Sequence, residues 1–227
     1  MFQKRLTHRD VLRVMLVGLA VTLSGCAGVT PHGVGASGPA REAGCPQVTT
    51  PFGNPSNNPS QPAWNRLHSG TDFNVPIGTQ VYAVAPGVVI SYLYYSRSDI
   101  GHINMMVYHG QDVDGKHVFS FYTHLSEQIK KPGDRVERGE IIALSGNSGT
   151  RNNTPHLHLG LWRMAVGPGP DLAAFIKQAI ARLDKEAVLA DPTMYWADPS
   201  RPGFDPSKSY PERPIRLTYP LRCSRSD

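Results

Sequence analysis

The sequence predicts a mainly β fold: an antiparallel β-sheet domain followed by one helix and a proline-rich tail. Three observations lead to this prediction. Between residues 67 and 164, short β-rich runs alternate with turns, and no long helical period interrupts them. The 22 glycines and 20 prolines supply many turns. After residue 170, apolar residues recur at intervals of three and four, which is the spacing of one amphipathic helix.

The predicted strands are seven runs rich in β-branched, aromatic and other apolar residues. They cover residues 80–85, 87–94, 103–109, 117–124, 135–137, 141–145 and 156–162. The pair Asp114-Gly115 predicts a hairpin turn between the third and fourth runs. Such a connection favours an antiparallel sheet.

The predicted helix is about 18 residues long and begins after Asp171, a suitable N-cap residue. Its apolar positions are Leu172, Ile176, Ala179, Ile180, Leu183 and Ala187. From residue 191 the chain is rich in proline and aromatic residues, which indicates a segment packed on the domain rather than an independent one.

The first 25 residues are typical of a bacterial lipoprotein signal. A basic start precedes an apolar run over residues 11–23, and Leu23-Ser24-Gly25-Cys26 follows, so Cys26 is the expected lipid-bearing residue. The alternative, a membrane-spanning anchor, is disfavoured because a bilayer requires about 20 apolar residues. Ala27, rather than an acidic residue, resembles signals for the outer membrane. We therefore expect an exported protein anchored to the periplasmic face of the outer membrane.

The remaining chain is long enough for one substantial core with appendages. We divide it into a flexible tether (26–44), a folded domain (45–166) and an extension packed on that domain (167–227). Without the signal, 19 basic residues face 17 acidic ones, and no long basic stripe is interleaved with aromatics. We expect no nucleic-acid partner and no nucleotide cofactor.

Two cysteines, Cys45 and Cys223, remain if Cys26 is lipidated. An exported compartment is oxidising enough to pair them, and a bridge would tie the start of the domain to the C-terminal end. Two free thiols are the alternative.

Two short motifs carry the candidate chemistry. His68 and Asp72 form H-x-x-x-D, while His156 and His158 form H-x-H. A catalytic zinc ion takes three ligands from histidine and carboxylate groups and keeps a fourth position for water. Residues i and i+2 of a strand project from the same face, so His156 and His158 can share one site. Either motif alone is weak evidence.

The residues around these motifs carry a much more specific signal. The series HSGTDF (68–73), GTQVYA (78–83), GVV (87–89), YTHLS (122–126), GDRV (133–136), SGNSG (145–149) and PHLHL (155–159) occurs in order. This series closely resembles the M23 family of zinc metallopeptidases, of the lysostaphin and LytM type, over roughly residues 66–164. The resemblance implies an antiparallel β-sheet (duplicated-hybrid-like) catalytic domain with a groove over the zinc.

The resemblance implies that His68, Asp72 and His158 bind one zinc ion per chain. It implies that His124 and His156 are catalytic without binding the metal. Members of the family cut peptide cross-links of bacterial peptidoglycan, so the expected substrate is its stem peptides and the expected enzyme is a D,D-endopeptidase. The alternative is a silent or autoinhibited wall-binding protein that activates a cell-wall amidase.

Two departures from the family pattern concern the shape of the groove. The usual Gly-Asn before the central strand reads His102-Ile103 here, and the final motif ends in Leu159-Gly160-Leu161. We assign no role to His32, His102, His109 or His117. The segment 133–149 also resembles the hairpin of biotinyl or lipoyl carrier domains, but its turn has no lysine to modify.

Overall fold

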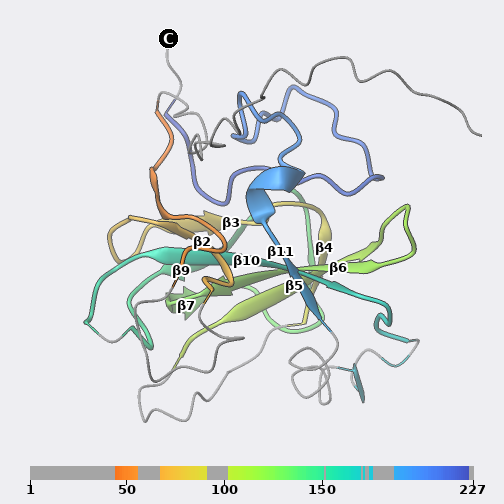
Figure 1. Cartoon of the computed structure of the whole chain (residues 1–227), viewed down its shortest axis with the longest axis horizontal. Coiled ribbons are helices and arrows are strands. Elements are labelled where there is room, and N and C mark those ends of the chain that lie inside the picture. The colour runs from red at the N-terminus through yellow and green to blue at the C-terminus, as the bar shows by residue number, and fades with distance from the viewer. Residues whose placement is uncertain are drawn as a thin grey trace, which may run out of the picture. The chain divides into compact units, whose positions relative to one another are not determined.

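Two antiparallel sheets contain all the strands of the described residues (Figure 1). The computed structural model describes residues 44–55, 67–90, 102–150, 152–169, 171, 174–175 and 187–224, all within one compact unit, 37–227. The larger sheet has the strand order β1-β2-β10-β6-β5-β4-β8, with β11 also pairing to β10, and the smaller has the order β3-β9-β7. The strands are β1 (Val48–Thr50), β2 (Gly70–Phe73), β3 (Gln80–Tyr82), β4 (Gly87–Val89), β5 (Met105–Gln111), β6 (His117–Thr123), β7 (Leu125–Gln128), β8 (Arg135–Val136), β9 (Ile141–Ser145), β10 (Leu157–Met164) and β11 (Val188–Ala190).

The prediction of an antiparallel, mainly β fold is therefore confirmed. The hairpin between β5 and β6 closes as expected, with Gly115 at φ 79° and the Asp112 amide donating to the Lys116 carbonyl at 2.8 Å. The sequence patterns did not indicate β1, β2, β7 or β11, which are three or four residues long. Within the described part of the chain, no helix has the length and apolar character needed to cross a bilayer.

The helix predicted after Asp171 lies mostly outside the described residues. Ala174 and Phe175 are helical, and the Asp171 carboxylate accepts a hydrogen bond from the Ala174 amide at 2.8 Å, as an N-cap residue does. The other helix of the described residues is the 3₁₀ turn η2 (Pro192–Tyr195). Cys26, the signal and the tether also lie outside the described residues, except Gly44.

Strand β10 separates two apolar clusters, because its side chains alternate between the two faces of the larger sheet. Leu157, Leu159 and Leu161 are fully buried in the main core, while Met164 belongs to a second cluster on the other face. His158 shares the face of Met164 by this alternation. The candidate site therefore lies on the face of the larger sheet that is turned away from the main core.

The C-terminal extension completes the main core. Its buried members are Trp196, Ile215, Leu217, Tyr219 and Leu221. Figure 1 shows this extension, in blue, along one side of the larger sheet. Two backbone hydrogen bonds of 2.8 Å hold the extension in place. The Thr218 amide donates to the Val84 carbonyl, and the Tyr82 amide donates to the Pro220 carbonyl. A disulfide joins Cys45 to Cys223, the pairing that the cysteine count led us to expect.

A partly buried polar network lies between β5, β6 and the turn before β4. His109 Nδ1 lies 2.8 Å from the Pro86 carbonyl oxygen, and its Nε2 lies 2.8 Å from Ser120 Oγ. Ser120 in turn contacts the Tyr122 hydroxyl at 3.1 Å, which accepts from the Val84 amide at 3.0 Å. Each of these buried polar groups is thereby satisfied. Burial lowers the pKa of His109 to about 4, although its hydrogen bond to Pro86 acts in the opposite direction.

Candidate metal centre

Three neighbouring strands place the candidate site. Asp72 on β2 is the direct antiparallel partner of His158 on β10, and His158 is also paired with Thr123 at the end of β6. His124 follows Thr123 at once, and His68 lies two residues before β2 begins. Directly opposed residues on one face have Cβ atoms about 4.5–5.5 Å apart. The register of the sheet therefore gathers side chains that are up to 90 residues apart in the sequence.

His68, Asp72 and His158 form a metal site, with one ligand atom from each lying within 4.8 Å of the others. Asp72 Oδ1 is 3.0 Å from His68 Nε2 and 2.8 Å from His158 Nδ1, and the two nitrogens are 3.0 Å apart. A tetrahedral face around an ion with bonds of about 2.0–2.2 Å has edges of about 3.3–3.6 Å, so this near-equilateral triangle of two nitrogens and one oxygen is somewhat tighter than the metal-bound arrangement would be. These donors suit a catalytic zinc site.

The ligand atoms are oriented by contacts on their far sides. His68 Nδ1 lies 3.0 Å from the Pro51 carbonyl oxygen, and because a carbonyl only accepts, this nitrogen carries the proton. His68 Nε2 is then the unprotonated atom in the neutral ring. His158 Nε2 lies 3.5 Å from Ser69 Oγ, which leaves Nδ1 to face Asp72. Such outer contacts fix the ring orientation and the tautomer of a metal-binding histidine.

The charges of the site support a deprotonated Asp72. Burial raises the pKa of this carboxyl, but hydrogen bonds from His158 and His68 and their charges outweigh that effect, so the pKa lies well below its usual range. Burial lowers the pKa of His158 despite its hydrogen bond to Asp72. For His68, burial acts to lower the pKa, but the hydrogen bond and charge of Asp72 outweigh it and the pKa is raised. A negative carboxylate beside a neutral imidazole is the protonation state that metal binding needs.

His124 and His156 lie beside this triangle with their ring centroids 4.4 Å apart. His124 Nδ1 is 2.7 Å from the Ser148 carbonyl oxygen, and His156 Nδ1 is 3.0 Å from that of Thr154. In each neutral ring Nε2 is therefore the available acceptor. His156 Nε2 lies 3.9 Å from Asp72 Oδ1. Burial lowers the pKa of His124 to about 4, an effect that its hydrogen bond to Ser148 opposes, so this ring is neutral near pH 7.

The backbone of His124 is in the left-handed region, at φ 61°. This residue lies where the chain leaves β6 of the larger sheet and enters β7 of the smaller one. A non-glycine residue in this conformation costs on the order of 1–3 kcal/mol and persists only where its surroundings hold it. The turn gives His124 a side-chain direction that a continuing strand would not.

The structure brings together all five histidine and aspartate residues that the motifs pointed to, and adds one that sequence reasoning missed. The ring of His102 lies 5.9 Å from that of His124, tilted by 42°. The signal in the sequence that could have pointed to His102 was its departure from the family pattern, in which a glycine is usual at this position. His117 stacks on Tyr108 instead, and His109 is hydrogen-bonded within the polar network, so neither belongs to the site. His32 lies outside the described residues.

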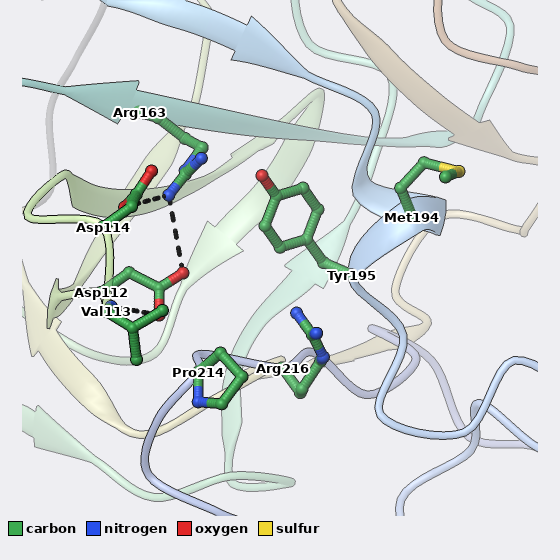
Figure 2. A pocket seen from close by; sticks show the side chains of 8 residues that line it. All are labelled: Asp112, Val113, Asp114, Arg163, Met194, Tyr195, Pro214 and Arg216. Carbon is green, nitrogen blue, oxygen red and sulfur yellow. Dashed lines mark hydrogen bonds and ion pairs between the residues drawn. The ribbon is translucent and has the colours of Figure 1, made fainter.

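A second concavity, of about 430 Å³, lies where the β5–β6 hairpin meets the C-terminal extension (Figure 2). Arg163 on β10 contacts Asp114 at 2.6 Å and Asp112 at 3.5 Å. Tyr195 and Arg216 contribute from the extension. Arg163 pairs with both carboxylates and ties β10 to the hairpin, so this surface is better described as a junction between chain segments than as a second catalytic centre.

Comparisons with known proteins agree with the site. Residues 66–168 match peptidase family M23. An uncharacterised metalloprotease of Haemophilus influenzae is 38% identical over 112 residues, 49% of this chain and 22% of that protein. Peptidoglycan DD-endopeptidase ShyA of Vibrio cholerae is 40% identical over 94 residues, 41% of this chain and 20% of that protein. The matches thus span about a fifth of the length of these curated relatives.

Among solved structures, the catalytic domain of lysostaphin from Staphylococcus simulans is 29% identical, with a TM-score of 0.41, and the match covers 58% of this chain and 92% of that one. LytU is also 29% identical, with a TM-score of 0.42 and coverage of 54% and 77%. The matched segment contains His68, Asp72, His124, His156 and His158. Residues 66–168 of this chain thus resemble a metallopeptidase domain of peptidase family M23.

Proposed function

We propose that this protein is a zinc metallo-endopeptidase that hydrolyses peptide cross-links of bacterial peptidoglycan. The observation that carries the proposal is the triangle of His68 Nε2, Asp72 Oδ1 and His158 Nδ1, with edges of 2.8–3.0 Å and two further imidazoles beside it. The relatives support the substrate class, because they include proteins described as peptidoglycan DD-endopeptidases and as lysostaphin.

His68, Asp72 and His158 would hold one zinc ion per chain. The chemistry that zinc supplies in such a site is polarisation of a carbonyl group and activation of water near neutral pH. Asp72 contributes the charge that compensates the metal, and the two histidines contribute neutral nitrogen ligands. The contacts to Pro51 and Ser69 hold the two rings in place when substrate enters.

His124 and His156 act on protons rather than on the metal. His124 Nε2 is positioned as a base because its Nδ1 is committed to Ser148 and its ring is neutral near pH 7. After accepting a proton from the attacking water, this nitrogen passes it to the leaving amine. His156, whose Nδ1 is committed to the Thr154 carbonyl, would stabilise the developing oxyanion by a hydrogen bond from Nε2 once that nitrogen has taken up a proton. The family resemblance implies both roles for this pair of histidines, and the division between them is our own assignment.

The bond that we assign is the D,D cross-link between D-alanine and a diamino acid. The reason is location: a lipoprotein held at the outer membrane through Cys26 meets direct cross-links rather than glycyl bridges. The anchor makes a separate prediction, since labelling with a fatty-acid analogue should disappear in Cys26→Ala. Labelling that persists in this variant would refute the anchor and leave the hydrolase proposal intact.

Digestion of purified peptidoglycan by the zinc-loaded protein tests the activity, with mass spectrometry of the products. Cross-linked dimers should disappear, and D-alanine should be exposed as a new C-terminus. His124→Ala is the control, because it should bind zinc at one per chain and leave the dimers intact. If the wild-type protein binds zinc and cuts no muropeptide, the alternative of a wall-binding amidase activator or an autoinhibited enzyme becomes the better account.

A further inference from the structure

His102 packs against His124 although no motif includes it. The two ring centroids are 5.9 Å apart with an interplanar angle of 42°. Neither nitrogen of the His102 ring has a hydrogen-bond partner in the described part of the chain, and the residue is partly buried. What this ring offers His124 is therefore a packing surface and not a hydrogen bond.

Three hydrogen bonds fix the segment of His102 beside His124. The Leu125 amide, directly after His124, donates to the Ile103 carbonyl at 3.0 Å. The Ile103 amide donates to Ser148 Oγ at 3.0 Å, and the Ser148 carbonyl lies 2.7 Å from His124 Nδ1. Ser148 thus holds both histidine segments at once, through its hydroxyl on one side and its carbonyl on the other.

Gly149 leaves the space that the His102 ring fills. A Cβ at this position would lie 2.2 Å from Cε1 and Nδ1 of His102, closer than any real contact. The φ of 70° at Gly149 also favours glycine. The imidazole of His102 is therefore closely seated between the Gly149 backbone and the ring of His124, in a place that a larger residue at position 149 would close.

We propose that His102 is a positioning residue that holds the plane of the His124 ring. His124 has a strained backbone and, among the described residues, one hydrogen bond from its side chain, so hydrogen bonding restrains its ring at one nitrogen. A ring packed on its side restricts the remaining rotation. Groups that act on protons must be held within about 0.5 Å and 10–20° of the productive geometry, which is the work of such supporting contacts. The catalytic consequence rests on the proposed function.

If His102 acts by packing rather than by hydrogen bonding, two substitutions at this position should have different effects. His102→Phe keeps a planar ring in the same seat and removes both nitrogens. His102→Gly restores the residue that is usual in the family pattern and empties the seat. If the ring acts by its shape, phenylalanine preserves the function of His124 and glycine does not. His117→Gly is the matched control, since His117 stacks on Tyr108 at the other end of β6.

Steady-state kinetics on a soluble cross-linked muropeptide tests this, with each variant loaded with zinc to one per chain. We expect His102→Gly to lower kcat by about 10-fold with KM within about 2-fold, because misplacing a catalytic group acts mainly on the chemical step. His102→Phe should keep kcat within about 3-fold of the wild type, and His117→Gly should match the wild type. An unchanged kcat in His102→Gly, a change confined to KM, or an equal loss in the Phe variant would each overturn the proposal.

A second readout does not need hydrolysis, which separates this inference from the proposed function. Long-range ¹H–¹⁵N spectra of the imidazole groups report the tautomer of His124. The wild type should show one fixed Nδ1–H tautomer, because Nδ1 donates to the Ser148 carbonyl. His102→Gly should show averaged or broadened nitrogen signals for His124, while His102→Phe keeps the fixed pattern. Identical His124 signals in the wild type and His102→Gly would overturn the positioning role whether or not the protein cuts peptidoglycan.

Discussion

Asp72 lies directly opposite His158 in the antiparallel ladder between β2 and β10, and its Oδ1 is 2.8 Å from His158 Nδ1. The metal site is therefore a product of strand register. A slip of one residue in this pairing would turn one of the two side chains to the opposite face of the sheet. Changes that weaken the pairing of β2 with β10 should therefore also lower the affinity of the site for the metal.

Replacing the metal-binding carboxylate tests this link directly. Asp72→Asn removes the negative charge but keeps the shape, so we expect zinc affinity to fall by at least about 100-fold. The wild type should also lose thermal stability when a chelator removes zinc, because binding at 100 times the Kd adds about 2.7 kcal/mol. Differential scanning calorimetry with and without chelator measures both effects. The melting temperature of Asp72→Asn should not respond to the chelator, and an equal response in the two proteins would contradict the assignment.

Gly70 is required by the close approach of β2 to β10. A Cβ at this residue would lie 2.3 Å from the Leu159 carbonyl oxygen and 2.7 Å from His158 Nε2. Gly70→Ala should therefore push the strands apart and weaken zinc binding by about 10-fold or more, as loss of a contact that orients a ligand does. Competition with a chromogenic chelator measures this. Gly169→Ala is the control, since nothing lies within 4 Å of its added Cβ, and it should bind zinc like the wild type.

The partly buried His109 predicts a pH-dependent component of stability. Its folded-state pKa of about 4 lies below the unfolded value of 6.5, so the unfolded chain binds more protons between these values. The contribution is complete above about pH 6.5 and is lost as the pH falls toward 4, by roughly 2–3 kcal/mol. Urea denaturation of the wild type and His109→Gln near pH 7 and pH 4.5 measures it. The stability difference between them should shrink by that amount at the lower pH, and a constant difference would show that His109 does not titrate in this way.

The sequence predicted the centre of the site better than its surroundings. His68, Asp72, His124, His156 and His158 were found because their flanking motifs occur in a specific order. The contact of His102 with His124 could not be found this way, since it depends on how the chain before β5 meets the turn after β6. No local periodicity encodes such a meeting.

The sequence also did not identify the residues by which the C-terminal extension enters the main core. Trp196, Leu217 and Leu221 are buried in the main core, yet they come from irregular segments with no strand or helix period. Aromatic and apolar residues among prolines indicated that the extension is packed, but not which sheet face it covers. Strand β2 was missed for a related reason, because Gly70 and Asp72 have low strand propensity and are retained for the site.

The disulfide predicts how strongly the extension is tied to the domain. Cys45 and Cys223 are 178 residues apart, and neighbouring hydrogen bonds join Ser224 to Gly44 at 2.7 Å and Tyr219 to Pro46 at 2.6 Å. Replacing both cysteines with serine should lower the free energy of unfolding by about 2–5 kcal/mol. Reductant should shift the denaturation midpoint of the wild type in the same direction and leave the double variant unchanged. A wild-type midpoint that does not respond to reductant would count against this contribution.

Two neighbouring carboxylates on the β5–β6 hairpin should differ widely in their contribution to stability (Figure 2). The Asp112 side chain is 5% exposed, and its Oδ1 accepts hydrogen bonds at 2.9 Å from the amides of Val113 and Ile215. Asp112→Ala should cost about 2–3 kcal/mol, because it leaves the Ile215 amide of the extension buried without an acceptor and removes one partner of Arg163. Asp114, 44% exposed, also pairs with Arg163, yet Asp114→Ala should cost much less stability because solvent screens this pair. Urea denaturation of the two variants measures the difference. Equal losses of stability would mean that the ion pairs with Arg163, rather than the hydrogen bond from the Ile215 amide to Asp112, hold this junction.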